Sequence, residues 1–266
     1  METGEIKSLS IVLFGAGNVA TQLGKALNSQ GHRIVQIVGR SETNAKELAS
    51  AVGSEYTVDI SKLNRKANLY ILAVPDSAIN ELASSIDKLE GLVVHTSGST
   101  PMIALERLSD EYGVFYPFQT FTKGREANLS GVPFCLEANS SEGYCVMFQL
   151  AKSLGGEPLE MNSKQREMLH LAGVFSCNFV NHMLAIAQQL AQESEFEFKL
   201  LEPLIVETVE KALQGDPLGS QTGPAVRGDS ETIKKHIAQL SRIDDELRDL
   251  YLAISTSILN LKQANE

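Results

Sequence analysis

The chain has 266 residues, of which 43% are hydrophobic and 21% charged, and its formal net charge at pH 7 is −10. This balance is ordinary for a globular protein of one or two domains. The acidic charge argues against a nucleic-acid partner, because binding phosphates requires a basic surface. No apolar run approaches the roughly 18 residues that span a bilayer, and residues 1–8 lack the pattern of a signal peptide. We therefore expect a cytoplasmic protein without a membrane partner.

The first segment with a recognisable chemistry predicts a dinucleotide-binding turn. The apolar strand 11–14 breaks into GAGNVA over residues 15–20 and then continues as a helix. In this pattern the first glycine permits a tight turn, the second lets a pyrophosphate approach the backbone, and the third small residue, Ala20, keeps the helix against the strand. The free N–H groups and the dipole of the helix N-terminus favour phosphate. The predicted cofactor contacts are Gly15, Ala16, Gly17, Asn18 and Val19.

The end of the next strand indicates which dinucleotide binds. The helix ends at Gly31, and the apolar strand 32–39 runs into Arg40 and Ser41. An NAD-preferring site places an acid here, to bind the ribose 2′-hydroxyl. A cation and a hydroxyl suit a 2′-phosphate instead, which arginine binds through paired charge-assisted hydrogen bonds. NADP is therefore predicted over NAD; the alternative is that Arg40 is an ordinary solvated surface residue.

Strands and helices alternate up to about residue 160, and only helices follow. Such alternation predicts a mostly parallel, doubly wound sheet, and the change of character indicates a domain boundary. We predict an α/β fold, with a Rossmann dinucleotide-binding domain over residues 1–158 and an all-helical domain over residues 159–266. The expected later strands are 69–74, 92–95, 113–118 and 133–137; the expected helices are 41–51, 77–89 with Asp76 as its cap, 143–154, 163–193, 200–214 and 230–263.

Ligands of open α/β sheets bind at the carboxyl ends of the strands, where two loops stand out. Val74 and Pro75 follow one strand and could line the nicotinamide. Ser97, after another strand, offers a hydroxyl beside a flexible glycine to both cofactor and substrate. The alternative is that proline, serine and glycine are present as ordinary turn residues.

The apolar helix that begins near residue 163 carries an unusual row of polar residues. It is apolar nearly all round, which predicts a buried central helix, yet it contains His170, Asn178, Asn181 and His182. At about 3.6 residues per turn, His170 and Asn181 share a face, with Asn178 at its edge and His182 elsewhere. His170 is the predicted general acid, because histidine titrates near neutrality, and Asn178 or Asn181 orients the substrate. The alternative is a structural pair that bonds between helices or across a dimer.

A glycine- and proline-rich loop over residues 215–229 separates two later helices. Connections between helices are usually about 2–8 residues long, so this loop is a candidate for function. Arg227 could clamp a substrate carboxylate, or it could form a salt bridge. Asp229 or Ser230 is expected to cap the following helix.

Scattered cysteines and histidines predict no metal site. The three cysteines, Cys135, Cys145 and Cys177, show no Cys-x-x-Cys spacing, and the five histidines stand apart. Zinc sites need these residues at close, regular spacing, so free thiols in a reducing compartment are expected.

Four motifs together resemble one known family: GAGNVA at 15–20, HTSG at 95–98, YPFQTF at 116–121 and TGPAVRGD at 222–229. The chain resembles the Rossmann-like NADP oxidoreductases whose helical half is a domain of unknown function (DUF2520), within the 6-phosphogluconate-dehydrogenase-like superfamily. The resemblance implies hydride transfer and a helical second domain that builds a homodimer. Many relatives have histidine in place of Tyr116, which argues against a role for that loop. The catalytic lysine of several superfamily enzymes has no clear counterpart, since Lys164 lies too early, and His170 is the closer candidate.

These observations predict an NADP-dependent oxidoreductase for a small carbonyl, hydroxy or imine substrate that bears a carboxylate. Two alternatives remain open. A nucleotide-binding sensor or regulatory protein would keep the glycine turn without a proton donor, and a second kind of reductase would pass hydride to another cofactor, such as a deazaflavin.

Overall fold

The computed structural model describes residues 7–122 and 124–265 of the chain. The chain divides into two compact units, residues 1–182 and residues 183–266. The last strand of the first unit ends at Glu160, and residues 163–182 of the long helix that follows belong to that unit. The predicted boundary at 158/159 coincides with the end of the strands and stays a prediction.

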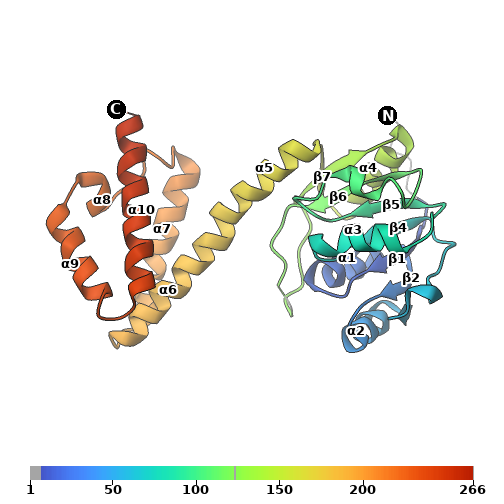
Figure 1. The fold of residues 1–266 in the computed structure, drawn as a ribbon, viewed down its shortest axis with the longest axis horizontal. Helices are drawn as coiled ribbons and strands as arrows, with labels where there is room; N and C mark the ends of the chain where they lie inside the picture. The colour runs from blue at the N-terminus through green and yellow to red at the C-terminus, as the bar shows by residue number, and fades with distance from the viewer. Residues whose placement is uncertain (1–6, 123, 266) are drawn as a thin grey trace. The chain divides into compact units, whose positions relative to one another are not determined.

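The first unit contains an eight-stranded sheet with the order β3-β2-β1-β4-β5-β6-β7-β8 (Figure 1). All neighbouring strands are parallel except β6 and β7, which are antiparallel. The predicted mostly parallel sheet is therefore confirmed. The strands are β1 (Ser10–Phe14), β2 (Arg33–Val38), β3 (Glu55–Thr57), β4 (Leu69–Leu72), β5 (Leu92–His95), β6 (Tyr112–Pro117), β7 (Pro133–Ala138) and β8 (Glu157–Glu160).

Helices cover both faces of the sheet, which explains why the central strands are apolar along their whole length. One apolar cluster joins the sheet to α1, α2 and α4, and a second joins the opposite face to α3. Every residue of β4 and β5 is buried. The helices are α1 (Asn18–Ser29), α2 (Glu42–Val52), α3 (Asp76–Ser85) and α4 (Ser141–Ser153).

The start of α3 differs from the prediction. Asp76 is the first residue of the helix, and Pro75 occupies the N-cap position without a side-chain hydrogen bond. The Asp76 carboxylate instead accepts a hydrogen bond from the Ser99 hydroxyl. Asp76 therefore joins the loop after β5 to the helix and does not cap the helix. The helix ends at Ser85, earlier than the expected residue 89.

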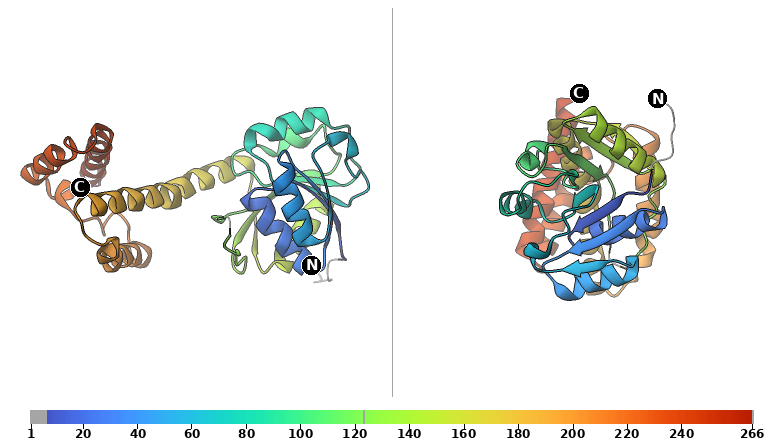
Figure 2. Two further views of the ribbon diagram at one scale, coloured as in Figure 1. Left: turned by 90° about the horizontal axis from the view of Figure 1, so that it is seen from below. Right: turned by 90° about the vertical axis from the view of Figure 1, so that its right-hand side faces the viewer.

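One continuous helix spans Ser163–Glu193 (Figure 2). It consists of α5 (Ser163–Gly173), the π-helical segment η3 (Val174–Phe179) and α6 (Val180–Glu193). By length and composition alone this helix could cross a membrane, which corrects the expectation from apolar runs: the interspersed histidine and asparagines hide its length. Core helices of soluble proteins can be equally long and apolar, so length and composition alone do not show a membrane span.

The prediction that this helix is buried is wrong for the single chain. Phe175 is 64% exposed and Met168 is 60% exposed. The reason is that the helix presents apolar side chains all round its circumference, and no described part of this chain covers them.

The second unit is helical, as predicted, with one break that the sequence did not reveal. Four residues interrupt the expected helix 230–263, and Asp244 caps the helix that follows by accepting a hydrogen bond from the Glu246 N–H. Asp229 caps the preceding helix, as expected, with the Thr232 N–H as its donor. The elements are η4 (Phe198–Leu201), α7 (Glu202–Gln214), α8 (Pro224–Arg227), α9 (Ser230–Leu240) and α10 (Asp245–Ala264).

Candidate functional site

The glycine turn after β1 has the geometry that a bound pyrophosphate requires. Gly15 has a φ of +106°, and a Cβ at this position would lie 2.2 Å from the Ala73 carbonyl oxygen at the end of β4. Only glycine therefore fits between the two strand ends. A Cβ at Gly17 would meet no atom within 4 Å, which leaves open space in front of the turn.

The N-terminus of α1 is open to an anion. No side chain caps it, and its first turn contains no acidic residue, whereas Ser41, Ser140 and Asn162 cap α2, α4 and α5. The first N–H groups of α1 and the positive end of its dipole are thus available to a phosphate. The residues present fit a dinucleotide.

The side chains of two α1 residues hold the loop that follows β6. Asn18 donates its amide to the Phe121 carbonyl (3.0 Å), and Gln22 donates to the Arg125 carbonyl and accepts from the Ala127 N–H (2.8 and 2.9 Å). The Asn18 side-chain amide is thus engaged by the loop, and Asn18 is the first residue of α1. The side chains of Ala16 and Val19 pack against the sheet core, so only the backbone of these two residues is available to a ligand at the turn.

The end of β2 brings a cation and a helix N-terminus together. Arg40 is exposed and forms no ion pair with the residues that the structure describes. Ser41 is the N-cap of α2, and its hydroxyl accepts from the Asn44 N–H at 3.4 Å. Glu42 lies in the first turn and accepts from the Tyr56 hydroxyl. The exposed Arg40 guanidinium favours a phosphate here, whereas the Ser41 cap and Glu42 leave the N-terminus of α2 less open to an anion than that of α1.

The loop after β5 uses the Ser97 hydroxyl for its own structure. Ser97 is 5% exposed, donates to the Thr100 hydroxyl (3.0 Å) and accepts from the N–H groups of Ser99 and Thr100 (3.1 and 2.8 Å). Its hydroxyl therefore shapes the loop and has little exposed surface for a ligand. Val74 and Pro75 lie at the neighbouring strand end, with Val74 half-buried and Pro75 exposed.

His170 lies against this loop and against the end of β6. The Tyr116 hydroxyl is 3.0 Å from His170 Nδ1. A Cβ at Gly98 would lie 2.6 Å from the same nitrogen, so the imidazole packs directly on the Gly98 backbone. The structure thus places the predicted proton donor at the carboxyl ends of β5 and β6. Tyr116 was missed as a partner of His170; its position at the end of a strand was the available signal.

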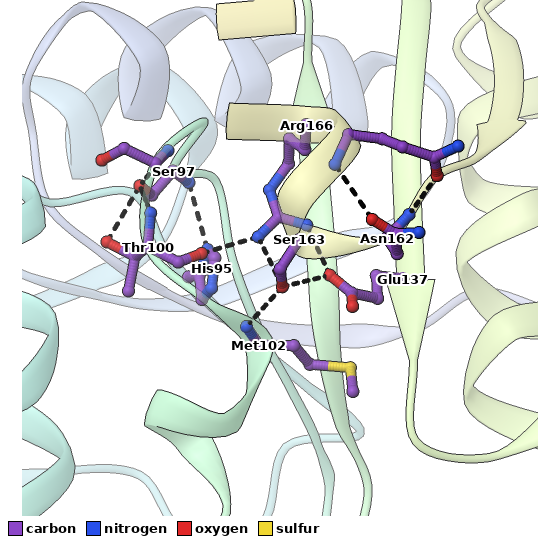
Figure 3. A network of polar contacts seen from close by, with 10 residues as sticks. His95, Ser97, Thr100, Met102, Glu137, Asn162, Ser163 and Arg166 are labelled. Atoms are coloured by element: carbon purple, nitrogen blue, oxygen red, sulfur yellow. Dashed lines mark hydrogen bonds and ion pairs between the residues drawn. The ribbon is translucent and has the colours of Figure 1, made fainter. Parts of the chain in front are cut away.

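A buried network fixes the helix that carries His170 to the sheet (Figure 3). The Arg166 side chain is fully buried; its guanidinium pairs with Glu137 at 2.5 Å and donates to the Thr100 carbonyl at 2.6 Å. The Ser163 hydroxyl donates to Glu137 and accepts from the Met102 N–H. Because residues four apart share a helix face, this anchor also sets the direction of His170.

His95, at the end of β5, is a buried neutral histidine. Its Nδ1 accepts from the Ser97 N–H at 3.2 Å. Burial, together with the positive charge of Arg166, lowers the pKa of His95 to about 4. Its imidazole is therefore uncharged at neutral pH, and its hydrogen bond with the Ser97 N–H holds the loop after β5 in place.

The π-helical segment changes which residues share the face of His170. A π turn closes its hydrogen bonds one residue later than an α turn, so it adds about one residue to the helix. The residues beyond it are rotated accordingly: Asn178 moves toward the angular position of His170, and Asn181 moves away from it. The expectation that His170 and Asn181 share a face assumed a regular α-helix and is corrected. His182 also moves toward the face of His170.

In the helical unit, Arg227 is exposed at the end of α8. Two hydrogen bonds from Thr232 lower the pKa of Asp229, and the charge of Arg227 lowers it further. The Arg227 guanidinium forms no ion pair with any carboxylate that the structure describes. It is therefore available to an acidic ligand.

Two family models match the chain: a Rossmann-like domain over residues 2–116, and a domain of unknown function (DUF2520) over residues 132–258. The structure is similar to that of a Bacteroides fragilis protein designated an NADP oxidoreductase. The two share 43% identity and a TM-score of 0.89, and the match covers 95% of this chain and 98% of that one.

More distant proteins share the fold. A 1-pyrroline-5-carboxylate reductase from Streptococcus pyogenes is 15% identical with a TM-score of 0.61, over 96% of this chain and 99% of that one. A glycerol-3-phosphate dehydrogenase [NAD(P)+] from Staphylococcus saprophyticus is 29% identical over 92 residues, which are 30% of this chain. The match spans only 27% of the length of that curated relative.

The parallel sheet, the glycine turn and the open N-terminus of α1 are those of a dinucleotide-binding Rossmann domain. The similarity to NADP oxidoreductases assigns the chain to the oxidoreductases with a nicotinamide dinucleotide cofactor. Within that class, the chain belongs to the family in which a Rossmann-like domain is followed by a DUF2520 domain.

Proposed function

We propose that this oxidoreductase uses NADP and transfers hydride between the nicotinamide and a small carbonyl, hydroxy or imine substrate that carries a carboxylate. The observation that carries the proposal is the position of His170, half-buried on the Gly98 backbone at the carboxyl ends of β5 and β6. These strand ends lie on the edge of the sheet that also bears the glycine turn, where parallel α/β sheets bind their ligands.

The cofactor is held by backbone on one side and by charge on the other. The backbone of residues 15–19 would hold the pyrophosphate, and Arg40 with Ser41 would hold the 2′-phosphate. Val74 and Pro75 line the nicotinamide, and Ser97 shapes the loop beside it. Bound NADPH supplies the hydride, so the matching proton must come from the protein or from water.

His170 supplies that proton in the proposed reaction. Addition of hydride to a carbonyl or imine carbon leaves electron density on the oxygen or nitrogen, which a positioned imidazolium neutralises. Asn178 or Asn181 donates its amide to orient the substrate, and the π turn favours Asn178 because it rotates this residue toward the helix face of His170. In the 1-pyrroline-5-carboxylate reductase that shares this fold, the named substrate combines an imine with a carboxylate. Arg227 is the proposed partner of such a carboxylate.

A homodimer accounts for the apolar surface of the helices. Phe175 and Met168 of the long helix and Leu204 and Leu213 of α7 are 60–82% exposed in the single chain. Exposed apolar surface on this scale is typical of a protein interface. The second unit also holds an apolar cavity of about 310 Å³ between α6, α8, α9 and α10. A dimer formed through the helical domain would cover these side chains. The protein would then be cytoplasmic and would need no membrane to cover its apolar surface.

Turnover measurements with a panel of 2-oxo acids and cyclic imines test the proposal. NADPH absorbance should fall with at least one of these compounds, and His170→Asn should abolish most of that turnover while NADPH binding is retained. His236→Asn, in the helical unit, is the matched control and should keep its activity. Normal turnover in His170→Asn would refute the assignment of the proton donor.

Light scattering tests the dimer. The wild-type protein should elute at twice its 28.9 kDa chain mass, and Phe175→Glu should shift it toward the monomer. A wild-type monomer at micromolar concentration would contradict the dimer.

A further inference from the structure

Tyr116 and His170 form a hydrogen-bonded pair at the carboxyl ends of β5 and β6. The two side chains come from β6 and α5, and their rings meet edge to face with centroids 6.0 Å apart and an interplanar angle of 70°. The hydroxyl oxygen lies 3.0 Å from Nδ1, within hydrogen-bond distance. A phenol at this place can therefore control which imidazole nitrogen bears the proton.

The imidazole has little freedom to leave this contact. The Gly98 backbone blocks one side of the ring, because even a Cβ there would lie 2.7 Å from Cγ of His170. Tyr116 is itself held by Phe118, with ring centroids 6.1 Å apart. Phe118 in turn fills the space beside Gly173 on α5, where a Cβ would be 2.8 Å from its ring. Two glycines and two aromatic rings thus fix the pair.

The helix backbone at His170 is anchored as well. Arg166, one turn earlier on α5, is bound to Glu137 of β7 and to the Thr100 carbonyl. The ring orientation of His170 is therefore set by groups on both sides of the helix turn. This orientation keeps Nδ1, and not Nε2, against the Tyr116 hydroxyl.

Tyr116 remains protonated over the whole pH range in which a histidine titrates. Burial, followed by the neighbouring Cys135 and Asp76, raises its pKa to about 12. The hydroxyl can donate to Nδ1 of the neutral imidazole and accept from Nδ1–H of the imidazolium. The hydrogen bond therefore survives both charge states. When the imidazolium gives up its Nε2 proton, the proton that remains on Nδ1 is donated to the Tyr116 oxygen.

We propose that Tyr116 is a positioning residue that occupies Nδ1 of His170 in both charge states, favours the Nε2–H tautomer of the resting neutral ring, and so leaves Nε2 as the nitrogen of the imidazolium that gives its proton to the substrate. The part that concerns the substrate rests on the proposed function; the tautomer itself does not. The state of a neutral histidine is decided by the hydrogen bond at its other nitrogen. A phenol that keeps its proton favours an unprotonated Nδ1.

Imidazole ¹⁵N NMR of the full chain, labelled at histidine, tests the tautomer without any substrate. At a pH where His170 is neutral, wild type should show its Nδ1 unprotonated and its Nε2 protonated. Tyr116→Phe removes only the hydroxyl and should move the His170 nitrogen shifts toward those of a mixture of tautomers. Gly98→Ala, which pushes the ring away from the loop, should act in the same direction while leaving Tyr116 intact.

The chain provides a matched control in the helical unit. There the Tyr251 hydroxyl lies 2.9 Å from Nδ1 of His236, with the rings also edge to face. Tyr251→Phe should change the signals of His236 and leave those of His170 unaltered. If His170 bears its proton on Nδ1 in wild type, or if its tautomer is unaffected by Tyr116→Phe, the proposal is overturned.

Kinetics then separate the tautomer from the proposed reaction. Tyr116→Phe should lower kcat about tenfold or more, with little change in KM or in the Kd of NADPH. A changed tautomer with unchanged kcat would leave the positioning of His170 intact but refute its use as the proton donor. An unchanged tautomer would refute the role of Tyr116 whatever the turnover.

Discussion

Removal of the Glu137 carboxylate should destabilise the first unit far more than an ordinary loss of charge. Arg166 has no exposed side-chain surface, and Glu137 is its only ion-pair partner among the described residues. In Glu137→Ala the contacts of Arg166 with the Thr100 carbonyl and the Ser163 hydroxyl remain, but the buried charge loses its counter-charge. Breaking a buried pair in this way costs about 3–5 kcal/mol.

Urea unfolding followed by far-UV circular dichroism measures this cost. A loss of about 3–5 kcal/mol corresponds to a change of roughly a hundred- to several-thousand-fold in the unfolding equilibrium. Glu157→Ala is the control, because it breaks the exposed Lys152–Glu157 pair, for which about 0–1 kcal/mol is expected. The double variant Arg166→Met with Glu137→Leu should recover much of the loss, since it removes both charges. A loss below about 1 kcal/mol in Glu137→Ala would refute the reasoning.

Three further perturbations address the site directly. His170→Asn should lower turnover by roughly 10²–10⁴-fold and leave NADPH binding unchanged, as stopped-flow assay and titration would show. Arg40→Ala should weaken NADPH binding about 10–100-fold, from the loss of charge-assisted hydrogen bonds, without affecting NADH; an equal effect on both would refute the 2′-phosphate contact. The folded-state pKa of His95 is about 4 against an ordinary value of 6.5, so the unfolded chain binds more protons between these values. The unfolding free energy should therefore fall as the pH drops through this window, by up to about 1.4 kcal/mol per pH unit, and His95→Gln should lose that part of the slope.

Most of the first unit could be predicted because its signals are local. Apolar runs marked six of the strands, and the glycine turn was legible within residues 15–20. The two missed strands, β3 and β8, lie at the edges of the sheet and are only three and four residues long. Both contain glutamate beside exposed positions, so neither shows the apolar run of a covered strand.

The candidate site was only partly predictable, because its contacts join distant segments. His170 was singled out from its apolar surroundings, but its partner Tyr116 lies 54 residues earlier in the chain. Arg166 gave no signal of burial, since a lone arginine in a sequence is normally solvated. Its burial depends on Glu137, whose strand pairs antiparallel to β6, and this pairing is a property of the whole sheet.

The π-helical segment explains why Asn178 and Asn181 could not be told apart from the sequence. Helical periodicity assumes about 3.6 residues per turn throughout, and nothing in the residues 174–179 marks the wider turn. A one-residue shift in the turn exchanges the faces of the two asparagines. The exposure of the apolar side chains of this helix could not be predicted either. The sequence shows that they are apolar, but it does not show whether the same chain or a second chain covers them.

A titration of the purified full chain with NADPH and, in parallel, NADH tests the proposed cofactor. The chain contains no tryptophan, so nicotinamide fluorescence can be followed without indole emission. We expect saturable binding of both dinucleotides, with NADPH bound at least tenfold more tightly than NADH. Binding of neither dinucleotide would contradict this expectation, because the open turn at Gly17 and the uncapped N-terminus of α1 would then serve another ligand.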